Sequence, residues 1–392
     1  MEGDFIKINS WLRPFSWCYG VAIGIRNMLF EMGVLKSHAF DIPIISVGNI
    51  TVGGTGKTPH VEYLIQLLKD KCNVAVLSRG YKRKKKGFII ANEQSTASDI
   101  GDEPYQIKCK YPGITVAVDK DRVHGINQLK QQPSAPDVVL LDDAFQHRYV
   151  KPGVNILLVD YHRLIIYDTL LPAGRMREPL SAKDRADIVL ITKCPKELKP
   201  MEFRVITKAM NLYPYQRMFF TTLQYNNLVP VFKDATKALD FASLKGYHIM
   251  LLTGIASPEH ICEDIKLLVP DYGSLMPLSF PDHHAFNKKD IQRINETFQS
   301  MAEPRIIITT EKDAARLHIV GGLSNDVRQS LFALPIKIQF LLDQEDTFNE
   351  KIIGYVRKNS RNSILVKKKD VNKSDDSNST GDRPRTISFR DN

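Results

Sequence analysis

Short apolar runs alternate with stretches of helical periodicity along most of the chain after residue 40. The runs that predict strands are 42–47, 73–77, 114–118, 137–141, 154–159 and 187–192. Helical periods near 59–70 and 119–132 separate several of them. Such alternation is typical of a mostly parallel sheet flanked by helices, in which buried strands are continuously apolar. We therefore expect an α/β fold.

A second set of apolar runs follows later in the chain, at 248–253, 305–310 and 336–340, with helical stretches near 257–267 and 287–300 between them. This set predicts a second, smaller α/β domain. The last residues are mostly Lys, Asp, Ser and Asn, a composition that favours disorder. We expect a core domain over 41–224, the smaller domain over 225–365 and a disordered charged tail over 366–392.

The N-terminal segment, residues 1–40, holds both tryptophans of the chain, Trp11 and Trp17, close to Arg13 and Arg26. Its uncharged run is too short to span a bilayer. Aromatic rings beside arginines are typical of a helix that lies on a membrane surface. An ordinary amphipathic helix packed on the protein is the alternative interpretation.

The overall composition indicates an ordinary globular protein and is compatible with several functions. The 392 residues are 43% hydrophobic and 25% charged, as in ordinary globular proteins. The net charge of +10 suits nucleic acid, anionic membranes or phosphorylated ligands alike. The five cysteines are scattered, which fits a reducing compartment and suggests no zinc site.

A glycine-rich turn follows the first predicted strand and leads into a helical stretch through Gly56-Lys57-Thr58. This is the layout of a phosphate-binding loop, in which lysine reaches the β- and γ-phosphates and threonine takes Mg²⁺. The first glycine of the usual pattern is replaced by Thr51, so Gly53 and Gly54 must make the turn. The alternative is a glycine-rich hairpin with an incidental lysine. The predicted ATP-binding residues are Thr51, Val52, Gly53, Gly54, Thr55, Gly56, Lys57 and Thr58.

The predicted strand 137–141 runs directly into Asp142 and Asp143. Ligands of open α/β sheets bind at the carboxyl ends of the strands, and an acid there helps to hold Mg²⁺ in phosphate-loop enzymes. Adjacent strand residues point to opposite faces, so one acid can serve the metal and the other the scaffold. His147 follows closely and suits either a phosphate contact or a structural role.

Asp102 follows Gly101 ahead of a possible helix, and Asp282-His283-His284 lies in the second half of the chain. A carboxylate paired with a histidine can take a proton from a hydroxyl nucleophile. Spacing alone does not bring Asp102 and either histidine together.

Two further segments carry positive charge. The run 78–86 is a dense basic loop that suits an anionic substrate, lipid headgroups or simply solvent. Arg177 follows Leu171-Pro172-Ala173-Gly174, and an arginine beside a transferring phosphoryl group offsets charge on its oxygens.

These blocks, in this order, resemble the tetraacyldisaccharide 4'-kinase family, the lipid A 4'-kinases of Gram-negative bacteria. The resemblance covers residues 42 to about 316. Its remaining blocks are Ser78-Arg79-Gly80-Tyr81, Gly101-Asp102-Glu103-Pro104, Asp142-Asp143-Ala144-Phe145-Gln146-His147, Arg177-Glu178-Pro179, Phe280-Pro281-Asp282-His283 and Thr310-Glu311-Lys312-Asp313.

The resemblance implies transfer of the γ-phosphoryl group of ATP to the 4'-hydroxyl of an acylated glucosamine disaccharide 1-phosphate. It implies Mg²⁺, two domains, and peripheral attachment to the cytoplasmic face of the bacterial inner membrane. By this resemblance Asp102 is the general base and His283 its partner. Lys57, His147 and Arg177 are active-site residues, and the metal lies near Thr58, Asp142, Asp143 and Glu178.

The chain departs from the family pattern at Lys82 and Ala144, where glycine is usual, and at Arg175-Met176 in place of Pro-Leu. The stretch 166–169 also lacks the usual Gly-Asn pair. These departures affect the expected acceptor site and leave the ATP and Asp102 blocks intact.

Three other classes compete with a lipid kinase. A regulatory ATPase or GTPase is disfavoured because Pro195 stands where a guanine-reading aspartate belongs. A nucleic-acid-binding ATPase would explain the charge, but the sequence contains no recognisable nucleic-acid module, and we expect no nucleic-acid partner. A non-catalytic membrane protein would not need the Asp102 and His283 blocks.

Overall fold

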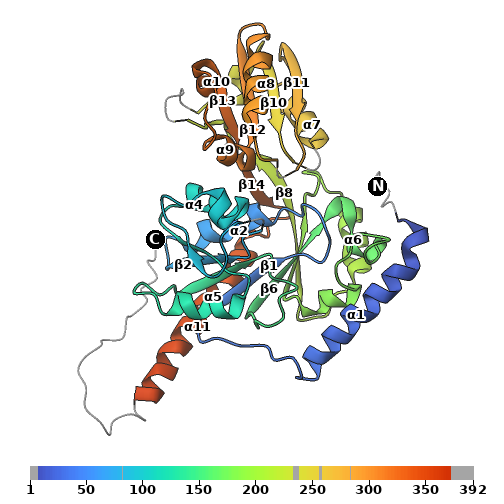
Figure 1. Ribbon diagram of the computed structural model, residues 1–392. Helices are drawn as coiled ribbons and strands as arrows, with labels where there is room; N and C mark the ends of the chain where they lie inside the picture. Colours follow the sequence, from blue (N-terminus) through green and yellow to red (C-terminus); the bar gives the residue numbers. More distant parts are fainter. Residues whose placement is uncertain (1–7, 82, 233–237, 256–257, 283, 372–392) are drawn as a thin grey trace. The chain divides into compact units, whose positions relative to one another are not determined.

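The computed structural model describes residues 8–81, 83–232, 238–255, 258–282 and 284–371, the last twelve by their backbone only. Two compact units can be distinguished, each with its own sheet (Figure 1). The first comprises residues 1–95, 111–223 and 338–392, and the second comprises 96–110 and 224–337. These units are not coextensive with the domains expected from the sequence, because 96–110 groups with the second unit and the chain from 338 onward with the first.

The first unit is built on a nine-stranded sheet within the described chain. In spatial order its strands are β14 (Ile336–Phe340), β8 (Arg217–Tyr225), β7 (Ile188–Thr192), β6 (Val154–Asp160), β1 (Ile44–Gly48), β5 (Val138–Asp142), β2 (Val74–Ser78), β4 (Thr115–Val118) and β3 (Ile89–Ile90). The pairs from β8 to β4 are parallel, and β3 is antiparallel to β4. All residues of β1, β2, β5, β6 and β7 are buried, as parallel strands between helical layers must be.

Helices and short 3₁₀ turns cover this sheet. The helices are α1 (Arg13–Glu31), α2 (Lys57–Leu68), α5 (Arg122–Lys130), α6 (Pro200–Met210) and α11 (Glu345–Val371). The 3₁₀ turns are Ser10–Leu12, Tyr161–Arg163, Ile165–Tyr167 and Leu180–Arg185. Ile126 and Leu129 of α5 pack with Leu77 and Val139, whereas Ile206 of α6 belongs to a separate core with β6 and β7. The two cores fill the space between the sheet and its helices.

The strand order reverses beside β1. The strands β2 and β5 lie on one side of β1 within the sheet, with β5 directly beside β1. The next strand, β6, lies on the other side of β1. Ligands of open α/β sheets bind at the carboxyl ends of strands near such a switch point. The residues that follow β1 and β5 are therefore the ones positioned for a ligand.

The strand predicted at 336–340 lies in the first sheet, not with the second set of apolar runs as its position in the sequence suggested. Its burial alternates, with Ile338 and Phe340 buried and Lys337 and Gln339 exposed, which is typical of a strand with one solvated face. The Phe340 ring packs 5.3 Å from that of Tyr63 and 4.7 Å from that of Phe348. These aromatic contacts, which no periodicity reveals, hold β14 in the first unit.

The second unit has a five-stranded sheet in the described chain, in the order β11 (Ser274–Ser279), β10 (His248–Thr253), β12 (Arg305–Thr310), β13 (Leu331–Leu334) and β9 (Val229–Pro230). Only β9 pairs in the antiparallel sense. The helices are α3 (Ala97–Ile100), α4 (Asp102–Lys110), α7 (Glu259–Leu268), α8 (Lys288–Gln299), α9 (Glu311–Leu317) and α10 (Asn325–Ser330), and Phe241–Leu244 is a 3₁₀ turn. α4 packs against α9, which explains why 96–110 belongs to this unit.

Helix α1, the long blue helix of Figure 1, has two unlike faces. Exposed Trp17, Val21, Ile25 and Met28 recur at helical spacing on one face, next to the 90% exposed Trp11. The other face buries Ser16 and Phe30. Among the described residues no helix is long and apolar enough to cross a bilayer.

Candidate active site

The glycine-rich turn joins β1 to α2, and its backbone needs glycine at three places. Gly53 and Gly56 have φ angles of 122° and 78°, which side-chain-bearing residues rarely adopt. A Cβ on Gly48 would lie 2.8 Å from that of Phe145. A Cβ on Gly53 or Gly54 would meet nothing within 4 Å, so the loop is bordered by open space there. Backbone amides at a helix start beside open space form a suitable site for phosphate.

Buried polar side chains hold this loop in shape. Asn49, which is fully buried, donates from Nδ2 to Thr55 Oγ1 over 2.8 Å. The Thr192 hydroxyl donates to the Thr55 carbonyl over 3.0 Å from the end of β7. His60 Nδ1 donates to the Gly56 carbonyl over 2.7 Å, and burial lowers the pKa of His60 to about 4, so the ring is neutral. The loop is therefore fixed from three directions.

The segment 175–178 pairs with the loop along its outer edge. Arg177 N donates to the Ile50 carbonyl over 2.7 Å, and Val52 N donates to the Arg175 carbonyl over 2.8 Å. Thr51 and Met176 form an antiparallel bridge between these bonds. This pairing brings the Arg177 side chain to Asn49, whose Oδ1 accepts a hydrogen bond from Arg177 Nη2.

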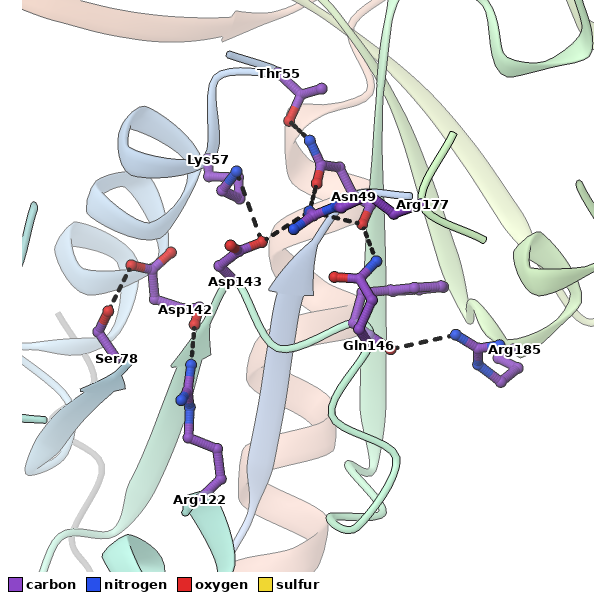
Figure 2. A network of polar contacts seen from close by, with 11 residues as sticks. Asn49, Thr55, Lys57, Ser78, Arg122, Asp142, Asp143, Gln146, Arg177 and Arg185 are labelled. Carbon is purple, nitrogen blue, oxygen red and sulfur yellow. Dashed lines mark hydrogen bonds and ion pairs between the residues drawn. The ribbon is translucent and has the colours of Figure 1, made fainter. Parts of the chain in front are cut away.

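Lys57, Asp143 and Arg177 form a charged group that we call the loop cluster (Figure 2). Asp143 Oδ1 lies 3.6 Å from Lys57 Nζ and 3.2 Å from Arg177 Nη2. Burial alone raises the pKa of Asp143, but the two cations outweigh it and hold the pKa below its ordinary value. Asp143 also has a φ of 47°, an uncommon conformation for a non-glycine residue that is often associated with function. Two cations thus share one ionised carboxylate.

The adjacent Asp142 is directed differently. Figure 2 shows its carboxylate on the side of β2, where Oδ2 accepts from the Ser78 hydroxyl over 3.3 Å. Its carbonyl accepts from the buried Arg122 over 3.2 Å. The two acids diverge at the end of β5, because Asp142 is the last residue of the strand and Asp143 leaves it with a φ of 47°.

A magnesium ion would find oxygen donors here. Mg²⁺ is usually held by one or two carboxylates, with substrate phosphates and waters completing its coordination. Thr58, in the first turn of α2, and the adjacent Asp142 and Asp143 supply such donors, and they fit the ion. No group of three or more His, Cys, Asp or Glu side chains arranged for a metal occurs in the described part of the chain, so the protein alone would hold the ion only partly.

Glu178 and His147 lie near the loop without joining the loop cluster. Glu178 is 1% exposed, and its Oε2 accepts from Arg185 over 2.6 Å. Burial and the neighbouring Arg122 lower the pKa of His147 to about 4. Glu178 Oε1 and His147 Nε2 are buried and accept or donate no hydrogen bond within the described residues. The metal role of Glu178 and the catalytic role of His147 stay predictions.

In the second unit, Asp102 begins α4 after Gly101, whose φ and ψ of 95° and 159° are open essentially to glycine alone. Its Oδ2 lies 2.5 Å from Arg316 Nη2, and Arg316 Nη1 lies 3.0 Å from Asp313 Oδ1. We call Asp102, Asp313 and Arg316 the helix cluster, because it joins α4 to α9.

The predicted partner of Asp102, His283, lies outside the described residues, but its neighbours are placed. Asp282 is paired with Lys312 of α9 over 3.0 Å. His284 is engaged elsewhere, since its Nε2 lies 2.8 Å from Asp290 Oδ2 and its ring stacks on Phe280. Of the two histidines, His284 is therefore the less suitable partner for Asp102.

Several residues of the site make contacts that the sequence does not predict. Asn49, Gln146 and Thr192 are ordinary polar residues until the fold places them against the loop; Gln146 Nε2 donates to the Asn49 carbonyl over 2.6 Å. Helix α1 also contributes, with Tyr19 donating to the Arg177 carbonyl over 2.9 Å and Arg26 to the Gln146 carbonyl over 3.0 Å. Their spacing in the sequence, 158 and 120 residues, explains why no local pattern reveals them.

Comparison with known proteins identifies close relatives. The chain matches the LpxK family model, described as tetraacyldisaccharide-1-P 4'-kinase, over residues 8–384. It is 52% identical to the tetraacyldisaccharide 4'-kinase of Bacteroides thetaiotaomicron over 384 residues, covering 95% of this chain and 100% of the relative. It is 55% identical to that of Phocaeicola vulgatus over 367 residues, covering 93% and 99%.

A solved structure is also similar. The LpxK of Aquifex aeolicus, crystallised in complex with ATP, superimposes with a TM-score of 0.70 at 32% identity, covering 89% of this chain and 99% of that one. The α/β fold expected from the sequence is thereby confirmed.

Proposed function

This chain belongs to the tetraacyldisaccharide 4'-kinase family, and we propose that it transfers the γ-phosphoryl group of ATP to the 4'-hydroxyl of an acylated glucosamine disaccharide 1-phosphate in lipid A biosynthesis. The family resemblance drawn from the sequence is confirmed. The observation that carries the proposal for this chain is the loop cluster. In it, Lys57 and Arg177 both pair with the carboxylate of Asp143, and the open glycine loop lies beside them.

Phosphoryl transfer needs positive charge around the oxygens of the transferred group. Lys57 and Arg177 carry that charge. Lys57 begins α2 directly after the loop, and the bonds from Asn49 and the 175–178 segment hold Arg177 beside it. We assign ATP binding to residues 51–58. When bound, Mg²⁺ would neutralise phosphate charge, and Thr58, Asp142 and Asp143 are the residues that would hold it.

The acceptor hydroxyl is a weak nucleophile, and we assign its general base to Asp102. The 4'-oxygen forms a bond to the γ-phosphorus, the bond from that phosphorus to the β,γ-bridging oxygen breaks, ADP departs, and the hydroxyl proton passes to Asp102. We assign His283 as the partner of Asp102. The pairing of the preceding residue, Asp282, with α9 supports this choice, because the same helix holds Asp102.

The acceptor carries acyl chains that stay in a bilayer, at about 0.8 kcal/mol per buried CH₂. We propose that the exposed stripe of α1 attaches the enzyme peripherally to the cytoplasmic face of the inner membrane. Trp11 and Trp17, 90% and 73% exposed, are the aromatic residues suited to that interface.

Replacing both tryptophans with serine should reduce sedimentation of the protein with anionic phospholipid vesicles roughly tenfold or more. Equal binding by that variant and by a Tyr213→Ser control, altered at an exposed tyrosine outside α1, would refute the attachment.

A direct assay tests the catalytic proposal. The purified chain is incubated with Mg²⁺, γ-labelled ATP and detergent-solubilised acylated disaccharide 1-phosphate, and labelled lipid is the expected product. A folded, ATP-binding preparation that labels no lipid would overturn the proposal. Turnover stimulated by RNA or DNA but not by lipid would favour a nucleic-acid-dependent ATPase instead.

A further inference from the structure

One guanidinium in the second unit joins two carboxylates. Arg316 Nη2 contacts Asp102 Oδ2 at 2.5 Å and Nη1 contacts Asp313 Oδ1 at 3.0 Å. The side chains of Arg316 and Asp313 are 8% and 0% exposed, whereas that of Asp102 is 23% exposed. The arrangement therefore runs from a buried acid, through a nearly buried cation, to an accessible acid.

The buried end of this arrangement is fixed to the sheet. Asp313 Oδ2 accepts from Gly254 N over 2.8 Å, just beyond β10, and from the Thr310 hydroxyl over 2.7 Å at the end of β12. Thr310 also caps α9, because its Oγ1 accepts from Asp313 N. Arg316 is thus anchored to the carboxyl ends of two strands and holds Asp102 from there.

We propose that Arg316 is a positioning residue for Asp102, orienting the carboxylate and keeping it ionised to receive the proton of the acceptor hydroxyl. This inference rests on the proposed role of Asp102 as general base. An arginine guanidinium keeps its positive charge in proteins, so it directs the carboxylate without taking the proton itself. Two adjacent donors in a rigid fork can hold two carboxylates in a defined geometry, which a lysine ammonium does less well.

A purely structural tether between α4 and α9 is the competing explanation, and the chain offers a matched control. Lys110 of α4 pairs with Glu311 of α9 over 2.6 Å, with side chains 28% and 18% exposed. This second ion pair joins the same two helices without involving Asp102. Lys110→Gln therefore weakens the tether and leaves the helix cluster intact.

The test measures kcat and KM against pH for Arg316→Gln, Arg316→Lys and Lys110→Gln, alongside thermal melts. Charged residues described near Asp102 include Glu103 on α4 and Asp313 on α9. Arg316→Gln should lower kcat roughly 10- to 100-fold with a nearly unchanged KM for ATP. It should also move the acid limb of the kcat profile to higher pH, since a neighbouring cation favours the ionised carboxylate.

The other two variants separate charge from geometry. Arg316→Lys should keep the position of the acid limb while recovering kcat only in part. Lys110→Gln should keep kcat within about twofold of the parent, because this ion pair does not contact Asp102 or Arg316. Equal losses of kcat in Arg316→Gln and Lys110→Gln, with an unmoved acid limb, would overturn the proposal. If Arg316→Gln does not fold, full kcat in Arg316→Lys overturns it.

Asp102→Asn distinguishes this inference from the function on which it rests. If Asp102→Asn keeps the parental kcat, the base assignment fails, and the positioning role fails with it. If Asp102→Asn loses kcat while Arg316→Gln does not, only the positioning role fails.

Discussion

The loop cluster and the helix cluster use the same chemistry with opposite balance. In the first unit, Lys57 and Arg177 surround Asp143, so two cations meet one carboxylate. In the second, Asp102 and Asp313 flank Arg316, so two carboxylates meet one cation. An excess of positive charge attracts phosphate, and an excess of negative charge supplies a base. This difference agrees with the roles that we propose, phosphate binding for the loop cluster and proton acceptance for the helix cluster.

The two clusters also differ in how they are supported. The loop cluster stands on a glycine turn whose shape depends on Asn49, Thr192 and His60. The helix cluster is anchored through Asp313 to the ends of two strands. We expect substitutions around the loop to affect the handling of ATP, and substitutions in the helix cluster to affect turnover alone.

The largest expected effect separates the clusters most sharply. Asp102→Asn should lower kcat by roughly 10³-fold, because a positioned base contributes about that much, while KM for ATP stays near the parental value. Steady-state kinetics at saturating acceptor measures both quantities. Parallel losses in kcat and ATP affinity would make Asp102 a structural or nucleotide-site residue and erase the contrast.

Lys57→Met tests the loop cluster. Removing a cation from the phosphate site should lower kcat/KM for ATP by roughly 10²-fold or more. Isothermal titration with ATP should show weaker binding as well. Lys69→Met, at the opposite end of α2, is the control and should behave as the parent does; equal ATP binding by both variants would contradict the loop assignment.

A smaller effect should follow from Tyr19→Phe, which removes the hydrogen bond to the Arg177 carbonyl. Loss of one such bond costs on the order of 1 kcal/mol, equivalent to about a fivefold change. We expect a few-fold lower kcat in detergent solution, with Tyr213→Phe as the exposed control. An unchanged kcat would show that α1 does not tune the loop cluster.

The last prediction concerns stability, and it follows from the titration of His60. His60 has its pKa lowered from 6.5 to about 4 by burial, so the unfolded chain binds more protons than the folded one between these values. The free energy of unfolding should therefore fall as pH drops below 6.5, by about 2 kcal/mol near pH 5 from this residue. Urea unfolding at pH 7 and pH 5 measures the difference. His60→Gln should reduce this pH dependence, and an unaltered dependence would rule out His60 as its source.

Sequence patterns predicted what is local. Parallel strands appear as continuous apolar runs, so β1, β5 and the turn before Lys57 could be placed without a structure. Long-range contacts could not be placed. Arg316 meets Asp102 across 214 residues, and Thr192 meets Thr55 across 137. β14 was misplaced because Tyr63, one of its aromatic partners, lies far away in the chain. The contact of His284 with Asp290 was equally out of reach of the sequence, and the role of His283 stays a prediction.

The two-faced first helix has a practical consequence for anyone shortening the protein. Deleting the first forty residues to remove the exposed apolar face would also remove Tyr19 and Arg26, which hydrogen-bond the backbone beside the glycine turn. Sluggish turnover by such a truncated enzyme would report a loosened scaffold, and it would say little about whether a lipid surface is needed.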